Sequence, residues 1–263
     1  FCEIYLFQLQ KIRPKVNWME QTSWIVVGLS AGLFEGSVMP VKTPGKDLAV
    51  WRQRSGQANA VEDRCPHRGM RFSMGFVRGD QLACRYHGWE FDGAGVCKNI
   101  PAHPTLQPPK TICAKTFVCQ EVNGFIVVNV GDDGAAMPAE YSELEGENMV
   151  PVRSVYLDAS ISTVRDWLMQ AVFPTFAAGQ DGTGTPVTYI YGNLNDNLVR
   201  ISAQVGATTE ELILALQALD DDRTGVHVQV SDMGSKEEMP AVQRHVARWL
   251  ADLRLRLESN DQS

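Results

Sequence analysis

Cys65-Pro66-His67 and Cys84-Arg85-Tyr86-His87 are two short stretches, separated by sixteen residues, that each contain one cysteine and one histidine. Thiolates and imidazoles are both ligands for transition metals. Each stretch is followed by a glycine, Gly69 or Gly88, which lets the backbone turn tightly around a bound group. We therefore predict a metal centre held by two loops, with one Cys and one His from each loop.

This ligand set predicts a Rieske-type [2Fe–2S] cluster, in which two cysteines bind one iron and two histidines bind the other. We expect Cys65 and Cys84 at the inner iron, and neutral His67 and His87 on the solvent side, where they raise the potential and carry electrons outward. The alternative is a structural zinc ion with the same four ligands. Zinc sites usually pair Cys with Cys and His with His, so the mixed pairs favour the cluster.

The residues around these ligands, 62–69 and 84–92, closely resemble the N-terminal domain of the Rieske non-haem iron oxygenases, and the resemblance extends over about residues 24–130. Respiratory Rieske proteins carry an additional cysteine in each loop, joined as a disulfide. The matching positions here are Met70 and Tyr86, so the resemblance implies the oxygenase or ferredoxin branch. For that branch we expect a potential of about −150 mV.

Aromatic and basic side chains surround the expected cluster. We expect Tyr86 and Trp89 to shield it. Residues 24–130 carry twelve basic against eight acidic side chains, whereas 131–263 carry nine against twenty-one. The basic side chains suit docking of an acidic donor, a ferredoxin or a flavin reductase; they could equally bind the acidic half of this chain or of a neighbouring subunit. The arginines concerned are Arg64, Arg68, Arg71, Arg78 and Arg85.

The expected fold class is α+β, with an antiparallel β Rieske domain at 24–130, an acidic linker at 131–150 and a smaller α+β domain at 151–263. By the resemblance, the last is a truncated, helix-grip-like oxygenase domain. Residues 1–23 are interpreted as a leader. If translation starts at Met19, the residues before it are a non-native extension. No apolar run approaches the roughly 20 residues of a membrane span, and cysteines without a paired framework suit a reducing cytoplasm. The net charge of −7 argues against nucleic acid.

Periodicity and turn signals predict the elements. Asn123-Gly124 joins two alternating strands in a hairpin. Two capping boxes, Thr208-x-x-Glu211 and Ser235-x-x-Glu238, predict helices, the first ending at Leu219. The other predictions are a helix at 161–171, strands at 187–191, 198–205 and 226–230, and a buried helical stripe of Val242, Val246, Trp249, Leu253 and Leu257.

A self-sufficient oxygenase also needs a mononuclear iron held by two histidines and a carboxylate. The family's helical motif for that iron aligns with residues 166–178. Its bridging aspartate becomes Gln170, and its two histidines become Phe173 and Ala178. We therefore interpret 151–263 as a degenerate domain, lacking a mononuclear iron.

Five histidines are present, and two are cluster ligands. We expect His103 in a loop and His227 on the surface of a strand, although His227, His245 and a distant carboxylate remain an alternative iron site. Three functions follow: an electron-transfer component serving a partner oxygenase subunit, a monooxygenase or demethylase with an unrecognised iron, or a structural subunit. The resemblance implies a trimer or mixed hexamer, and the sequence leaves open whether the chain is itself an enzyme.

Overall fold

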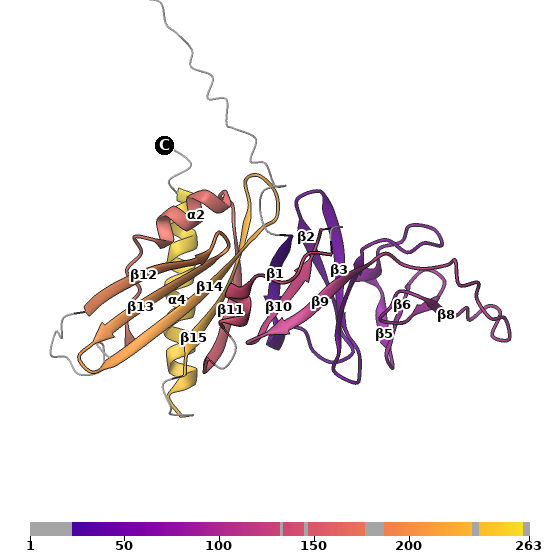
Figure 1. Cartoon of the computed structure of the whole chain (residues 1–263), viewed down its shortest axis with the longest axis horizontal. Coiled ribbons are helices and arrows are strands. Elements are labelled where there is room, and N and C mark those ends of the chain that lie inside the picture. Colours follow the sequence, from indigo (N-terminus) through magenta and orange to yellow (C-terminus); the bar gives the residue numbers. More distant parts are fainter. Residues whose placement is uncertain (1–22, 132–133, 145–146, 177–186, 233–236, 260–263) are drawn as a thin grey trace, which may run out of the picture.

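The computed structural model describes residues 23–131, 134–144, 147–176, 187–232 and 237–259. Two lobes lie end to end along the long axis of the molecule (Figure 1). The first lobe is all-β, and the second combines one sheet with helices. The predicted leader, apart from Ser23, lies outside the described residues.

A six-stranded antiparallel sheet forms the body of the first lobe, in the order β1-β10-β9-β4-β3-β2. Asn123 and Gly124 join β9 to β10, as predicted, and both have positive φ, 42° and 79°. Such a turn matches the twist of the flanking strands, and Gly and Asn tolerate it best. The strands are β1 (Trp24–Leu29), β2 (Val38–Thr43), β3 (Lys46–Arg52), β4 (Ala58–Glu62), β9 (Thr116–Val122) and β10 (Phe125–Asn129); the short helix η1 (Ser30–Gly32) follows β1.

A small four-stranded sheet lies at the far end of the first lobe (Figure 1). Its core, which it shares with β3 and β4 of the six-stranded sheet, contains the fully buried rings of Phe72 and Phe91, which meet edge to face at 5.1 Å. This core supports the two loops with the predicted ligands. The elements are η2 (Phe72–Met74), β5 (Phe76–Arg78), β6 (Gln81–Ala83), β7 (Glu90–Phe91) and β8 (Cys97–Asn99).

The second lobe is a five-stranded antiparallel sheet in the order β11-β15-β14-β13-β12. Helices α2 (Ile161–Leu168) and α4 (Met239–Ser259) pack against one face of it, and the predicted apolar stripe of α4 is buried there. The α+β fold class is thereby confirmed. The strands are β11 (Met149–Leu157), β12 (Val187–Asn195), β13 (Leu198–Val205), β14 (Thr208–Ala218) and β15 (Thr224–Ser231).

The predicted helix from Thr208 to Leu219 is wrong, because this segment is the strand β14. Leu212, Leu214 and Leu216 face the helices, while Ile213 and Ala215 face the first lobe. A strand buried on both faces has a continuous apolar run, which periodicity alone does not distinguish from a helix.

The prediction that His227 is a surface residue is also wrong. His227 lies in β15 but is fully buried. Its Nε2 lies 2.9 Å from Oε1 of Gln217, which can only accept, so Nε2 carries the proton. Its Nδ1 then accepts from the hydroxyl of Ser154 at 2.7 Å.

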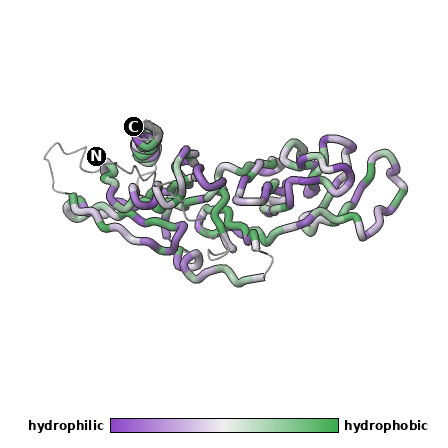
Figure 2. Tube along the Cα trace, turned by 90° about the horizontal axis from the view of Figure 1, so that it is seen from above, coloured by the Kyte–Doolittle hydropathy of each residue, from purple (hydrophilic) through white to green (hydrophobic). Residues whose placement is uncertain are grey.

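The lobes share one hydrophobic core, which contains Trp24 and Phe125 from the first lobe and Ile213 from the second. Hydrophobic segments run through this junction (Figure 2). Two buried glutamines cross it as well: Gln217 Nε2 donates to the carbonyl of Lys42 at 2.8 Å, and Gln229 Nε2 to that of Asn123 at 2.7 Å.

The segment between the lobes also packs into this core. Its helix α1 (Ala139–Ser142) carries the fully buried Tyr141, whose hydroxyl donates to the carbonyl of Trp24 at 3.3 Å. Part of the acidic stretch expected as a linker therefore belongs to the junction of the lobes.

Two further predictions concern the ends of helices. Helix α2 ends at Leu168, three residues before the predicted end, and Ser160 caps its start by accepting from the backbone N–H of Thr163 at 3.3 Å. The predicted cap Ser235 lies outside the described residues. None of the described helices combines the length and apolar character needed to span a bilayer.

Candidate metal centre

The first predicted ligand loop connects β4 to η2. The N–H of Cys65 donates to the carbonyl of Met70, and the N–H of Gly69 donates back to the carbonyl of Cys65, both at 2.8 Å. Gly69 has φ +73°, a conformation that favours glycine. These bonds close the loop into a compact turn.

The second ligand loop, between β6 and β7, repeats this geometry. The N–H of Cys84 donates to the carbonyl of Trp89 at 2.9 Å, and the N–H of Gly88 to the carbonyl of Cys84 at 2.8 Å. Gly88 has φ +70°. The two loops therefore place a cysteine and a following glycine equivalently, although their histidines stand two and three residues after the cysteine.

The loops bring all four predicted ligands together in two layers. Cys65 and Cys84 are buried, each 2% exposed. His67 is half-buried and His87 is exposed, and their ring centroids are 4.7 Å apart. Two thiols thus lie beneath two outer imidazoles.

The protonation states of these side chains differ in their readiness for metal binding: neutral His67 can coordinate directly, whereas the Cys65 thiol must lose its proton on binding. Burial raises the pKa of the Cys65 thiol to about 12, although the backbone N–H of His67 lowers it by favouring the thiolate. The neighbouring Cys84 thiol, which hydrogen-bonds with Cys65, raises the pKa further. Desolvation, followed by the charges of His87 and Arg68, lowers the pKa of His67, so its imidazole is neutral near pH 7 and can donate a lone pair.

The donor set fits a [2Fe–2S] cluster. Among the described residues, no three His, Cys, Asp or Glu side chains converge closely enough to hold one metal ion. A tetrahedral zinc site would need four ligands around one ion, whereas the cluster needs two at each of two irons. All five described cysteines are free thiols.

Aromatic rings cover the outer imidazoles. Trp89 is half-buried and stacks on His67 with ring centroids 4.1 Å apart. Tyr86 lies 3.8 Å from the His87 ring but is itself 56% exposed. The indole thus covers one face of His67, whereas His87 keeps its access to solvent. A role of these rings in protecting the cluster stays a prediction.

Two buried carboxylates beside the loops were not found from the sequence. Asp63 accepts from the N–H and the hydroxyl of Ser73, at 2.7 and 2.6 Å. Glu90 accepts from Arg78 at 2.6 Å and from Asn99 at 3.1 Å. Each carboxylate ties a ligand loop to the next segment of the small sheet. Their signal in the sequence is their position: Asp63 stands two residues before Cys65, and Glu90 directly follows Trp89.

The predicted docking arginines divide into two groups. Arg71 pairs with Asp47 at 2.9 Å, and Arg78 pairs with Glu90, so both serve the first lobe itself. The others, Arg64, Arg68 and Arg85, are exposed and make no ion pair with any described residue. The alternative prediction, that these arginines pair with the acidic half of this chain, is therefore wrong for Arg71 and Arg78.

The positions that align with the iron site of an oxygenase carry side chains other than histidine and aspartate. Phe173 is 1% exposed and packs edge to face against Tyr189 and Trp249, with ring centroids 5.7 and 6.2 Å away. Gln170 donates to the carbonyl of Asp166 at 3.2 Å. Ala178 lies outside the described residues.

Three side chains from two elements, β12 and α4, also fix the backbone around Phe173. The hydroxyls of Tyr191 and Tyr189 donate to the carbonyls of Ala171 and Phe173 at 2.9 and 2.6 Å. Trp249 Nε1 donates to the carbonyl of Val172 at 3.2 Å. This segment is therefore a packed part of the second core.

The other histidines lie apart from this centre. His103 is exposed in a loop, as predicted. His245 is half-buried on α4, with its ring 6.3 Å from that of Phe176. Both ring nitrogens of His227 are engaged by Ser154 and Gln217, so neither offers a lone pair to a metal.

Comparison with known proteins adds sequence and fold relationships. Residues 23–116 match the family model for the Rieske [2Fe-2S] domain. The chain is 34% identical over 158 residues to oxidoreductase NdmD of Pseudomonas putida, covering 59% of this chain and 27% of NdmD. It is 39% identical over 136 residues to the 4beta-methylsterol monooxygenase of Methylococcus capsulatus, covering 49% and 36% respectively. The chain thus spans well under half of these relatives.

Among solved structures, apo dicamba monooxygenase superposes with a TM-score of 0.73 at 21% identity, covering 91% of this chain and 86% of that one. NdmA of Pseudomonas putida gives 0.65 at 21% identity, covering 90% and 80%. At this identity the likeness shows the fold, which therefore extends through both lobes. The resemblance to Rieske non-haem iron oxygenases expected from the ligand loops is confirmed.

Proposed function

We propose that this protein, which carries a Rieske [2Fe–2S] domain in its first half, is an electron-transfer component. It accepts single electrons from a ferredoxin or a flavin reductase and delivers them to the iron of a partner oxygenase subunit. The observation that carries this proposal is the layering of the site, with two buried thiols beneath two imidazoles of which His87 reaches solvent.

Each residue of the site has a part in this function. When bound, the [2Fe–2S] cluster supplies a one-electron redox centre. Cys65 and Cys84 hold it from the buried side, where water is excluded. His67 and His87 hold it from the outer side and provide the shortest covalent route to the surface. Trp89 fixes the plane of His67 by stacking on it.

The second lobe supports transfer to a partner better than oxygenation within this chain. The position of one family histidine is occupied by Phe173, which fills the space between sheet and helix. The proposal divides the chain into a Rieske domain at 24–130, a connecting segment at 131–150 and a degenerate oxygenase-like domain at 151–263. In this proposal, the last domain holds no mononuclear iron.

The partners follow from charge and from relatives. Exposed Arg64, Arg68 and Arg85 suit an acidic donor. The relative NdmD is by name an oxidoreductase, and the superposed dicamba monooxygenase is by name an oxygenase, which supports a place for this chain in such a pair. The same proposal includes assembly as a trimer or mixed hexamer. It also includes a cytoplasmic location, where thiols stay reduced.

A second candidate is a monooxygenase or demethylase with its own iron. The observation in its favour is the shared fold, because one superposed dicamba monooxygenase structure is described with non-heme iron and dicamba. In this chain, that iron would require ligands other than the aligned Gln170 and Phe173.

Metal content separates the two candidates. The chain is reconstituted anaerobically with excess ferrous iron and sulfide, freed of loosely bound metal, and assayed for iron, sulfide and electrons taken up. Two irons, two sulfides and one electron per chain are the expected result. Three irons would instead support the oxygenase, and an iron-free protein holding zinc would overturn both candidates.

A further inference from the structure

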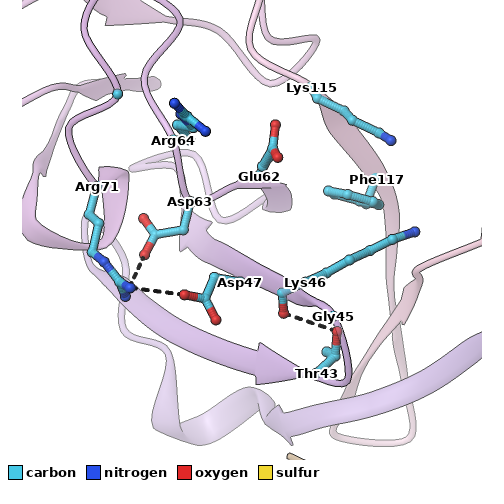
Figure 3. Close-up of a pocket in the computed structure, with 11 residues that line it drawn as sticks. Thr43, Gly45, Lys46, Asp47, Glu62, Asp63, Arg64, Arg71, Lys115 and Phe117 are labelled. Carbon is cyan, nitrogen blue, oxygen red and sulfur yellow. Dashed lines mark hydrogen bonds and ion pairs between the residues drawn. The ribbon is translucent and has the colours of Figure 1, made fainter.

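A polar cleft of about 700 Å³ lies beside the first ligand loop (Figure 3). Its walls come from the β2–β3 turn, from the end of β4 with the first ligand loop, and from the start of β9. Arg64, Glu62 and Lys115 lie around its upper part in Figure 3, and Lys46 and Asp47 around its lower part. Three segments distant in the sequence thus form one concave surface.

The cleft leads to the metal centre. A second cavity of about 370 Å³ shares Glu62, Arg64 and Lys115 with the first and is also lined by Cys65 and His67. A group bound in the cleft would therefore lie along the same surface as the first ligand loop. Tyr86 and His87, on the second loop, line neither cavity.

Ion pairing within the cleft leaves an excess of positive charge. Two of its carboxylates, Asp47 and Asp63, lie 2.9 and 3.7 Å from the guanidinium of Arg71. The carboxylate of Asp63 is 1% exposed and also holds Ser73, so it faces away from a ligand. Counting every charged side chain of the two cavities, five are basic and three are acidic: Lys46, Arg64, Arg68, Arg71 and Lys115 against Asp47, Glu62 and Asp63.

Contacts within the protein hold these cations in place. The ammonium groups of Lys46 and Lys115 both lie 5.6 Å from the centre of the Phe117 ring. Lys46 also donates to the carbonyl of Val130. Arg64 lies over the first ligand loop, because a Cβ added to Gly69 would be 3.3 Å from its Nε. Cations fixed before binding lose less conformational entropy when an anion docks.

We infer that this cleft binds a carboxylate-rich segment of the electron-donor protein, an inference that rests on the proposed function. Opposite charge steers such a partner to the cleft and sets its register. The charged lining offers only Phe117 as an apolar surface, which disfavours an apolar ligand. The donor then occupies the side of His67, and the tip with Tyr86 and His87 stays open to the acceptor.

The test measures binding of an octaglutamate peptide to the cluster-loaded protein at low ionic strength, with octaglutamine as the uncharged control. We expect octaglutamate alone to bind, with an affinity that falls as salt rises. The double variant Arg64→Glu/Lys115→Glu should weaken binding about tenfold or more. Arg54→Glu, a matched change of an exposed arginine outside both cavities, should bind as the unmodified protein does.

Several results would overturn the inference: no binding by the unmodified protein, undiminished binding by the double variant, or an equal loss in Arg54→Glu, which would indicate a diffuse basic face. Variants are compared only when their circular dichroism and cluster absorbance match the unmodified protein; otherwise Arg64→Gln and Lys115→Gln replace the charge reversals. Binding is measured without electron transfer, so a failure here leaves the metal and electron counts of the proposed function untouched.

Discussion

The imidazole of His67 lies parallel to the indole of Trp89, at an interplanar angle of 6°. Trp89 also accepts, through its backbone carbonyl, the hydrogen bond that closes the second ligand loop. One residue therefore connects the two loops: its backbone completes one, and its side chain covers the outer ligand of the other.

Trp89→Ala should shorten the lifetime of the cluster. Without the indole, water and oxygen reach one face of His67, and the orienting stack is lost. We expect visible absorbance in air to decay roughly 2- to 10-fold faster, in line with the strength of an aromatic pair. Trp89→Phe keeps a ring at this position and is the matched control. Equal decay in Trp89→Ala and the unmodified protein would show that the stack protects nothing.

His87→Cys should lower the reduction potential by more than about 100 mV, because a thiolate replaces a neutral imidazole at the outer iron. The measurement is a spectroscopic redox titration of the reconstituted protein. His103→Cys, at an exposed histidine in a loop of the same lobe, is the control and should leave the potential unchanged. An unaltered potential in His87→Cys would contradict the assignment of this ligand.

Acid should weaken the second lobe through His227. Burial lowers the pKa of this histidine from 6.5 to about 4. Between those two values the unfolded chain binds a proton that the folded chain refuses, so the free energy of unfolding falls as pH falls through this window. The loss amounts to about 3 kcal/mol at the acid end.

Urea unfolding at several pH values between 7.5 and 4.5 measures this effect as a slope. His227→Gln removes the titrating group, so its stability should depend less steeply on pH, even if it is lower throughout. Comparing the two slopes cancels the contribution of every other titrating group. Parallel slopes would mean that His227 is accessible to protons in the folded protein.

The junction of the lobes should depend on its buried glutamines. Gln217→Ala leaves the Nε2–H of His227 and the carbonyl of Lys42 without their partner, at a cost of about 1–3 kcal/mol. Denaturant unfolding measures this cost. Gln243→Ala removes a comparable bond of 2.7 Å to the carbonyl of Pro151 within the second lobe. Proteolysis between the lobes should increase in the first variant and not in the second.

The ligand loops could be predicted from the sequence because their information is local. Cys65, Cys84 and the glycines after them lie within a few residues of each histidine, and the chemistry of two irons fixes the pattern. The β9–β10 hairpin was readable for the same reason, since Asn123-Gly124 determines its turn.

The errors share one physical cause, which is the contact between the lobes. Ile213 in β14 and His227 in β15 belong to a sheet face that the first lobe covers. In a strand with one face in solvent, apolar and polar residues alternate, and His227 would lie on the solvent face. Because both faces of this sheet are covered, that alternation is absent. Such packing involves residues far apart in the chain, so no local pattern reports it. The polar cleft, made from three distant segments, was unpredictable for the same reason.

Phe173 gives the clearest test of what became of the second lobe. The side chain is buried between Tyr189 and Trp249, and the carbonyls around it are held by three aromatic side chains. If this segment is now a structural core, Phe173→Ala should leave a cavity that the fixed backbone cannot close. The expected cost is about 3–5 kcal/mol in the free energy of unfolding.

Val172 provides the matched control, because it is the neighbouring residue and is 62% exposed. Val172→Ala should change stability by less than about 0.5 kcal/mol. Both variants should keep the full absorbance and potential of the cluster, since Phe173 belongs to the core of the second lobe and the ligands to the first. A cost below about 1 kcal/mol for Phe173→Ala would show a loosely packed site with room for a ligand, and would favour the oxygenase over the electron-transfer component.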